Sequence, residues 1–168
     1  MIKKIIILTI SVMALGYLGL WVFASSIETS TQRTIHQQVD VDMSNKRLDQ
    51  LVNQERTEHG VKPVRRSAQV CKSAQGKLDN MLEDNYWSHD NPNGKKWLSF
   101  AKFDYMELGE NLAYGQATEE EVVTAWLDSP AHKEVMLKPT YTKGCNLIAN
   151  DVLFQGDITN LIVSWYSK

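Results

Sequence analysis

The chain has 168 residues, of which 43% are hydrophobic and 23% are charged, a composition typical of a globular protein. It excludes a wholly disordered or collagen-like chain. The formal net charge is -2. General nucleic-acid binding needs a basic face, so this charge balance argues against a nucleic-acid partner. The two cysteines are too few for a four-cysteine zinc site.

The N-terminal segment 1–24 has the pattern of a membrane anchor. Lys3 and Lys4 precede an uncharged apolar run from Ile5 to Ala24. A helix of about 20 apolar residues spans the core of a bilayer, and basic residues before it favour a cytoplasmic N-terminus. The run is longer than the apolar core of a cleaved signal peptide. We therefore predict one transmembrane helix at the cell membrane with an extracytoplasmic remainder. The alternative is cleavage after Ala24, which would give a secreted protein.

The exported part divides into a stalk and a domain. Segment 25–43 is polar and has neither a helical nor a strand period, so we interpret it as a stalk. The domain is predicted over 44–168. Its first helix has Ser44 as a candidate N-cap and Gly60 as a candidate residue beyond its end. A second helix begins at Ser67. Its predicted apolar stripe consists of Ala68, Cys71, Ala74, Leu78, Met81 and Leu82.

Residues 85–137 are predicted to form a loop followed by short helices. Turn residues predict a loop over 85–94, and the apolar residues of 97–103 predict a short buried helix. Thr118–Glu121 forms a capping box. Ser129 followed by Pro130 predicts a capped helix that ends near Leu137.

The C-terminal region has the composition of β-strands. Cys145–Ala149 and Leu161–Trp165 are predicted strands, with turns at Asn150-Asp151 and Gly156-Asp157. Helices followed by a late hairpin predict the α+β class rather than a doubly wound sheet.

Four phrases of the sequence carry a family resemblance. They are Leu51–Arg56 (LVNQER), Tyr86–Gly94 (YWSHDNPNG), Gly109–Gly115 (GENLAYG) and Trp126–Lys133 (WLDSPAHK). In this order they resemble the bacterial branch of the CAP superfamily, named after cysteine-rich secretory proteins, antigen 5 and pathogenesis-related 1 proteins. The likeness covers about residues 46–168. It implies an α-β-α sandwich in which a small antiparallel sheet lies between helical layers.

The resemblance also implies an open cleft lined by two histidines and one or two acids. In many family members this cleft binds a divalent cation, often zinc. The matching residues here are His89, Glu110 and His132, whereas the second glutamate of eukaryotic members has no clear counterpart near 128–129. Two imidazoles and one carboxylate are a three-ligand zinc set with an open position for water. The alternative is a hydrogen-bonded network in which Glu110 orients a histidine.

The family is varied in activity, so the resemblance implies a shape more firmly than a reaction. We expect a membrane-anchored, extracytoplasmic binding module whose cleft takes a small ligand, a lipid or a divalent cation. Its expected partners are the membrane and a lipid, an envelope component or another surface protein. A metal-dependent hydrolase that uses His89, His132 and Glu110 is the alternative. Ser88 and Ser129 lie beside the histidines in sequence, but we interpret them as a loop residue and a helix cap.

The cysteines and tryptophans carry two further expectations. Because thiols outside the cytoplasm tend to pair, we predict a disulfide between Cys71 and Cys145. A cysteine nucleophile partnered by His132 is the alternative. Most tryptophans sit among apolar or aromatic neighbours, so four are expected in the core. These are Trp87, Trp97, Trp126 and Trp165. A stacking surface for a glycan or lipid is the alternative role of Trp87, which lies beside His89.

Overall fold

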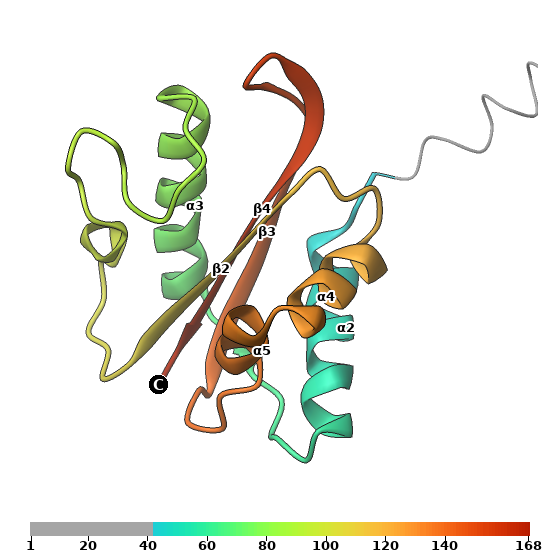
Figure 1. Cartoon of the computed structure of the whole chain (residues 1–168). Coiled ribbons are helices and arrows are strands. Elements are labelled where there is room, and N and C mark those ends of the chain that lie inside the picture. The colour runs from blue at the N-terminus through green and yellow to red at the C-terminus, as the bar shows by residue number, and fades with distance from the viewer. Residues whose placement is uncertain (1–41) are drawn as a thin grey trace, which may run out of the picture. The chain divides into compact units, whose positions relative to one another are not determined.

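The computed structural model describes residues 42–168, and helices and short strands alternate along this part of the chain (Figure 1). The elements are α2 (Asn45–Glu58), β1 (Arg65–Arg66), α3 (Ala68–Glu83), η1 (Trp97–Phe100), β2 (Leu108–Tyr114), α4 (Glu119–Asp128), α5 (Pro130–Met136), β3 (Lys143–Phe154) and β4 (Asp157–Ser167). The predicted anchor at 1–24 lies outside the described residues, as does the predicted stalk apart from its last two residues. No helix within 42–168 is long and apolar enough to cross a membrane.

Capping residues set the boundaries of two helices. The Ser44 side chain accepts a hydrogen bond from an amide in the first turn of α2, and Gly60 follows the helix with a φ of 71°. At α4, the Thr118 hydroxyl accepts from the Glu121 amide at 3.2 Å. The Glu121 carboxylate accepts from the Ala117 amide at 2.8 Å. The predicted capping box is therefore present, although Glu121 reaches one residue further back than expected.

Two other helix expectations need correction. Ser67 and Ser129 precede α3 and α5 as predicted, but neither side chain makes a cap hydrogen bond. The predicted buried helix over 97–103 is the 3-10 helix η1, in which Phe100 is buried and Leu98 is 43% exposed. Four residues make little more than one 3-10 turn, so η1 presents only part of its apolar surface to the core.

The four strands are ordered β1-β3-β4-β2. β3 and β4 form a long antiparallel hairpin, and β2 pairs antiparallel with the other edge of β4. The two residues of β1 pair parallel with β3, so the sheet is mixed and not purely antiparallel as expected. The predicted turn at Asn150-Asp151 is wrong. It is an irregularity between Ala149 and Val152, and β3 continues through it, because a bulge absorbs an extra residue without ending the pairing.

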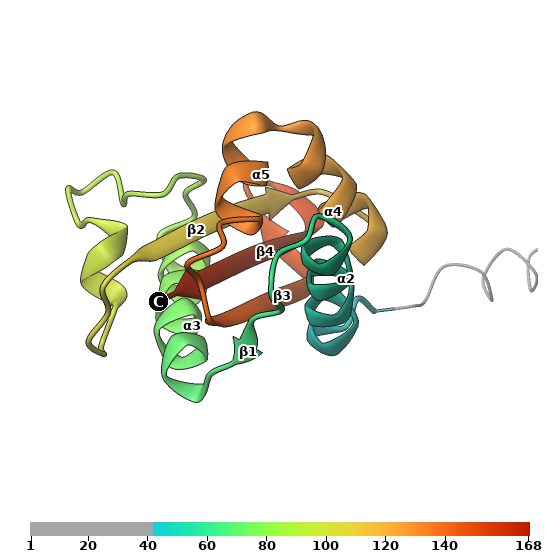
Figure 2. The same cartoon turned by 90° about the horizontal axis from the view of Figure 1, so that it is seen from below.

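Helices cover both faces of the sheet, as the α-β-α sandwich requires. Figure 2 shows α3 on one face and α2, α4 and α5 on the other. Each face has its own apolar cluster. The first joins α3 residues such as Leu78 and Met81 to Leu161 and Trp165 of β4. The second joins α2, α4 and α5 to the opposite face of the sheet and includes Met43. Because both clusters lie within 42–168, we expect this part to fold on its own.

Arg56 is fully buried at the end of α2. Its guanidinium donates to the carbonyl of Lys62 at 3.0 Å and to that of Met136 at 2.6 Å. It also donates to the carbonyls of Lys138 and Tyr141, each at 3.2 Å. Burial lowers the pKa of Arg56 from its ordinary value. A single charged side chain therefore ties the end of α2 to the segment that joins α5 to β3.

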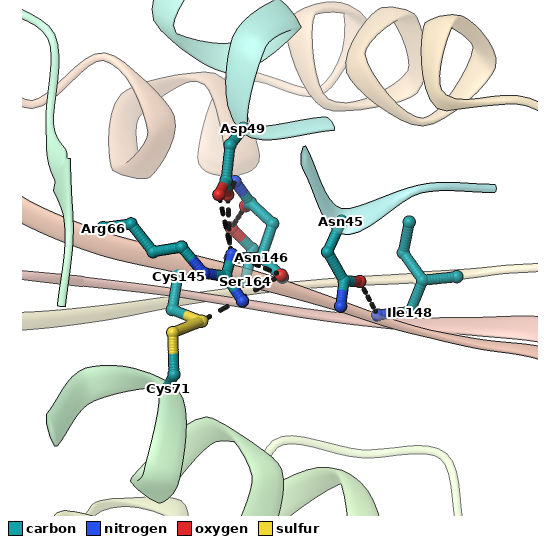
Figure 3. The surroundings of a disulfide bond; sticks show 8 residues. All are labelled: Asn45, Asp49, Arg66, Cys71, Cys145, Asn146, Ile148 and Ser164. Carbon is teal, nitrogen blue, oxygen red and sulfur yellow. Dashed lines mark hydrogen bonds and ion pairs between the residues drawn. A yellow bond between two sulfur atoms is a disulfide. The ribbon is translucent and has the colours of Figure 1, made fainter. Parts of the chain in front are cut away.

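The predicted disulfide between Cys71 and Cys145 is present and joins α3 to β3 (Figure 3). On the other side of the sheet, side chains of α2 form hydrogen bonds with residues of β3. Asp49 accepts from the side-chain amide of Asn146 at 2.7 Å, and Asn45 accepts from the backbone amide of Ile148 at 2.8 Å. Since β1 pairs with only two residues of β3, these contacts satisfy edge groups that would otherwise be open to another strand.

Candidate functional site

The candidate site forms where the loop 85–94 passes over β2. Residues 110 and 114 point to the same face of the sheet, because side chains alternate along a strand. His89 contacts the first of these positions, with its Nδ1 2.7 Å from Oε1 of Glu110. Trp87 contacts the second, with its ring centroid 5.5 Å from that of Tyr114. Trp87 and His89 of the loop therefore contact two side chains on the same face of β2.

Glu110 is the buried centre of this arrangement. Its side chain is 1% exposed. Oε1 faces His89, and Oε2 accepts a hydrogen bond from Nε1 of Trp165 at 2.6 Å. Glu110 and Trp165 are opposite each other in the register of β2 and β4, which brings the indole to the carboxylate. Both carboxylate oxygens thus have a partner, as a buried acid requires.

His89 presents the other side of its ring to the surface. Its side chain is 52% exposed, in contrast to Glu110. A carboxylate only accepts hydrogen bonds, so its contact with Nδ1 assigns the ring hydrogen to Nδ1. In the neutral ring Nε2 is then an acceptor, and no hydrogen bond within residues 42–168 occupies it. The buried carboxylate fixes both the tautomer and the orientation of an exposed imidazole.

His132 joins the site from α5. Partial burial lowers its pKa, and the nearby charge of His89 lowers it further. The two imidazoles therefore influence each other's charge. At neutral pH the His132 ring is therefore uncharged. The backbone also holds α5 against β2, since the Asn111 side chain donates to the His132 carbonyl at 2.9 Å. The structure brings His89 and Glu110 into direct contact, and His132 lies close enough for the charge of His89 to lower its pKa. We call His89, Glu110 and His132 the His–Glu site.

Sequence reasoning missed the partners that support this site. Trp165 was expected only as a core residue, and nothing in the sequence indicated its bond to Glu110. Lys77 was omitted from the apolar stripe of α3, yet it is fully buried beneath the loop and donates to the Ser88 carbonyl at 2.7 Å. Its position three residues after Ala74 was the available signal, because that spacing lies on the buried face of the helix.

The arrangement does not fit a metal ion bound by the three predicted residues. Within 42–168, no group of three or more His, Cys, Asp or Glu side chains is placed to hold one. Both oxygens of Glu110 are already engaged by hydrogen-bond donors. A cation bound by Glu110 would therefore share these oxygens with the donors of Trp165 and His89. The zinc expectation stays a prediction, and the geometry corresponds to the hydrogen-bonded alternative.

Other expectations near the site resolve differently. Trp87 is 39% exposed, so its expected core position is wrong, while Trp126 and Trp165 are buried. A tryptophan on a loop that packs on only one side keeps an accessible face. Both cysteines are consumed by the disulfide, which removes a cysteine nucleophile. A broad surface hollow lies along α2. Its lining residues are Lys46, Asp49, Gln50, Asn53, Gln54, Thr57, Glu58 and Pro63, and none belongs to the His–Glu site.

Comparison with known proteins identifies the family. The model of the cysteine-rich secretory protein family, CAP, matches residues 50–148. YkwD of Bacillus subtilis (strain 168), described as uncharacterized, is 34% identical over 122 residues, which cover 71% of this chain and 48% of YkwD. YlbC of the same organism, described as an uncharacterized membrane protein, is 30% identical over 102 residues, 59% of this chain and 30% of YlbC. The chain thus matches half or less of the length of these relatives.

Solved structures show the same fold. An extracellular protein containing an SCP domain from Bacillus anthracis str. Ames has a TM-score of 0.63 at 21% identity, over 73% of this chain and 39% of that one. An outer surface protein from Borrelia burgdorferi has a TM-score of 0.64 at 22% identity, over 73% of this chain and 90% of that one. The chain therefore belongs to the CAP family, and its α+β fold is that of bacterial SCP-domain proteins.

Proposed function

We propose that this chain is an extracytoplasmic binding module, anchored in the cell membrane by its N-terminal segment, whose His–Glu site takes a small polar ligand. The observation that carries the proposal is the Glu110 carboxylate. It is buried, it is engaged on both oxygens, and it holds the half-exposed His89 side chain through Nδ1. This carboxylate fixes the orientation of the His89 ring before any ligand arrives. A preorganised binding site requires such a fixed orientation.

The charge state of the site indicates which ligand groups it suits. At neutral pH the ring of His132 is uncharged, because burial and His89 lower its pKa. In the uncharged state an imidazole nitrogen without hydrogen accepts a hydrogen bond. A ligand that presents hydroxyl or amine hydrogens therefore matches His132. The exposed face of Trp87, held against Tyr114, adds a flat apolar surface to the same loop. Hydroxyl-rich or amine-bearing envelope components can donate such hydrogen bonds and can also pack against the exposed face of Trp87.

A hydrolase is the second candidate, because the contact between His89 and Glu110 also favours general-base chemistry. A carboxylate that fixes Nδ1–H leaves Nε2 to take a proton from water or from an attacking hydroxyl. The metal-dependent version of this activity needs His89, His132 and Glu110 as ligands. Within 42–168 these three side chains are not placed to hold a metal together, so the binding role is the simpler use of this geometry.

Two measurements on residues 42–168 separate these functions: calorimetric titration for binding and rate assays for hydrolysis. The first titrant is zinc, followed by soluble peptidoglycan fragments. The variants are His89→Ala and His132→Ala, with His59→Ala as the matched control, since His59 lies at the exposed end of α2. We expect a peptidoglycan fragment to bind the parent and the control, with both site variants at least tenfold weaker.

Hydrolysis is measured on the same samples with peptide and ester substrates. Turnover in the parent that disappears in His89→Ala would replace the binding proposal with an enzyme. If zinc were required as well, the metal-dependent version would stand. Binding of the fragments that neither site variant changes would place the ligand elsewhere on the domain and overturn the proposal for this site.

A further inference from the structure

A buried lysine lies beneath the His89 loop. Lys77 of α3 has no exposed surface, and a lysine is rarely fully buried unless it is paired with an acid. No carboxylate within residues 42–168 makes a salt bridge with it. Its Nζ instead donates to the Ser88 carbonyl at 2.7 Å and to the Tyr86 hydroxyl at 3.0 Å. Both acceptors belong to the loop that carries His89.

Side-chain hydrogen bonds also hold the rest of this loop to the end of the same helix. The Tyr86 hydroxyl donates to the side-chain oxygen of Asn80 at 2.9 Å. The Asn91 amide donates to the same oxygen at 2.9 Å and to the Asp84 carboxylate at 2.5 Å. The loop is therefore fixed on both sides of His89. The Ser88 carbonyl, in the peptide bond that leads directly into His89, is held by the ammonium of Lys77.

The charged groups that act on Lys77 come from β2 and from the loop. Burial lowers the pKa of Lys77 to about 8, while the negative charges of Glu110 on β2 and Asp90 on the loop oppose this change. Tyr86 is uncharged at these pH values, because burial above all, with Glu110 and Asp84 adding to it, raises its pKa to about 12. Glu110 is thus a buried negative charge that the ammonium of Lys77 offsets.

Keeping this lysine charged costs stability. Its pKa in the folded state lies below the ordinary value of 10.5, so the unfolded chain binds the proton more strongly between pH 8 and 10.5. Stability therefore rises with pH across that window, and at neutral pH the buried ammonium is unfavourable. An apolar side chain of similar length would avoid this cost. A residue that costs stability and supports a candidate site is typical of a functional role.

We propose that Lys77 is a positioning residue of the His–Glu site. Its ammonium fixes the Ser88 carbonyl, and so the approach of His89 to Glu110, and it offsets the buried charge of that glutamate. The inference deepens the proposed function, on which its biological meaning rests, by making the geometry of the site depend on pH. When Lys77 loses its proton in mildly alkaline solution, the charge-assisted bond to the loop weakens.

The test follows the backbone 15N chemical shift of His89 against pH in residues 42–168. This nitrogen belongs to the peptide group whose oxygen accepts from Lys77, so it reports the bond directly. We expect a step with its midpoint near pH 8 in the parent. The step should vanish in Lys77→Met. It should move to lower pH in Glu110→Gln, because Glu110 raises the pKa of Lys77. Lys72→Met, at an exposed position of the same helix, is the matched control and should keep the parent profile.

A second measurement separates positioning from a structural role. In urea unfolding at neutral pH we expect Lys77→Met to be at least as stable as the parent. Its amides over 87–90 should nevertheless exchange with solvent about tenfold faster or more. Loss of stability with no change in the loop would mean that Lys77 is only structural. A parent without the step, or a step that survives in Lys77→Met, would overturn the inference.

The outcome does not depend on knowing the ligand. If Lys77→Met does not fold, the parent profile and its displacement in Glu110→Gln still decide the question. If the step behaves as expected but no peptidoglycan fragment binds, the proposed ligand class fails while the positioning role stands. If a fragment binds but the step is missing, the positioning role fails while the proposed ligand class stands.

Discussion

Removal of the disulfide between Cys71 and Cys145 tests how much stability comes from one covalent link between layers. The bond joins residues 74 positions apart in the sequence. In the chain-entropy model, closing a loop of that length restricts the unfolded chain by about 4 kcal/mol at 25 °C. Domains are stable by only about 5–15 kcal/mol, so this is a large part of the total. Without the bond, α3 is held to the sheet by side-chain packing alone.

The assay is urea unfolding of residues 42–168 with and without reductant, together with the Cys71→Ala/Cys145→Ala double variant. With a slope of about 2 kcal/mol per molar urea, the midpoint should fall by about 2 M. Reduced parent and double variant should agree within the small packing loss at Cys145, which is fully buried. A fall worth less than about 1 kcal/mol would refute the reasoning. So would two thiols that alkylate in the native, unreduced protein.

Three other perturbations test separate parts of the structure. Arg56→Met should cost about 3 kcal/mol or more in urea unfolding, because buried backbone carbonyls lose their charged donor; a cost below about 1 kcal/mol would show that water or relaxation replaces the guanidinium. Thr118→Ala should cost about 1 kcal/mol by loss of the α4 cap, whereas Thr124→Ala at an exposed position of the same helix should not destabilise the protein. The lowered pKa of His132 means that the unfolded chain binds its proton more readily, so stability should fall as pH drops below about 6.5. His132→Gln should flatten this part of the unfolding profile, and an unchanged slope would contradict the assignment.

The sequence predicted the local boundaries of helices well. Ser44 and Thr118 mark the beginnings of α2 and α4, and Gly60 follows the end of α2, because caps depend on groups within a few residues of each other. The β2 strand was not predicted as a strand. Its burial depends on its position at the edge of β4 and not on an alternating pattern of its own, since five consecutive residues of it are buried.

The two predicted C-terminal strands were real but too short. Asn150 and Asp151 have the residue types of a turn, and their local signal predicts one. In the folded chain, pairing resumes beyond them with Val152 opposite Thr159, and the hairpin turns at Gln155-Gly156. Pairing with β4 along the whole hairpin outweighs the preference of two residues. The sequence could not show this, because the strength of a ladder depends on the partner strand.

The family resemblance pointed to His89, Glu110 and His132, but the sequence alone left both metal binding and a hydrogen-bonded network open as uses of them. The tertiary structure favours the network, since it brings Trp165 to one oxygen of Glu110 and His89 to the other. His89 and Glu110 are 21 residues apart, and Glu110 and Trp165 are 55 apart. No local pattern specifies such a contact.

What the sequence determined by itself is therefore mainly what forms within a few residues: the helix starts and the α+β class. It also predicted the pairing of Cys71 with Cys145, because the chain has only two cysteines. Tertiary structure decided which polar groups became buried and which partners they met. Lys77 lies on a helix face that the sequence marks as apolar, and only the loop folded over it supplies the acceptors that make its burial tolerable. The physical reason is that caps and periodicity act between chain neighbours, whereas the charge and orientation of a site depend on groups that folding brings together from distant segments.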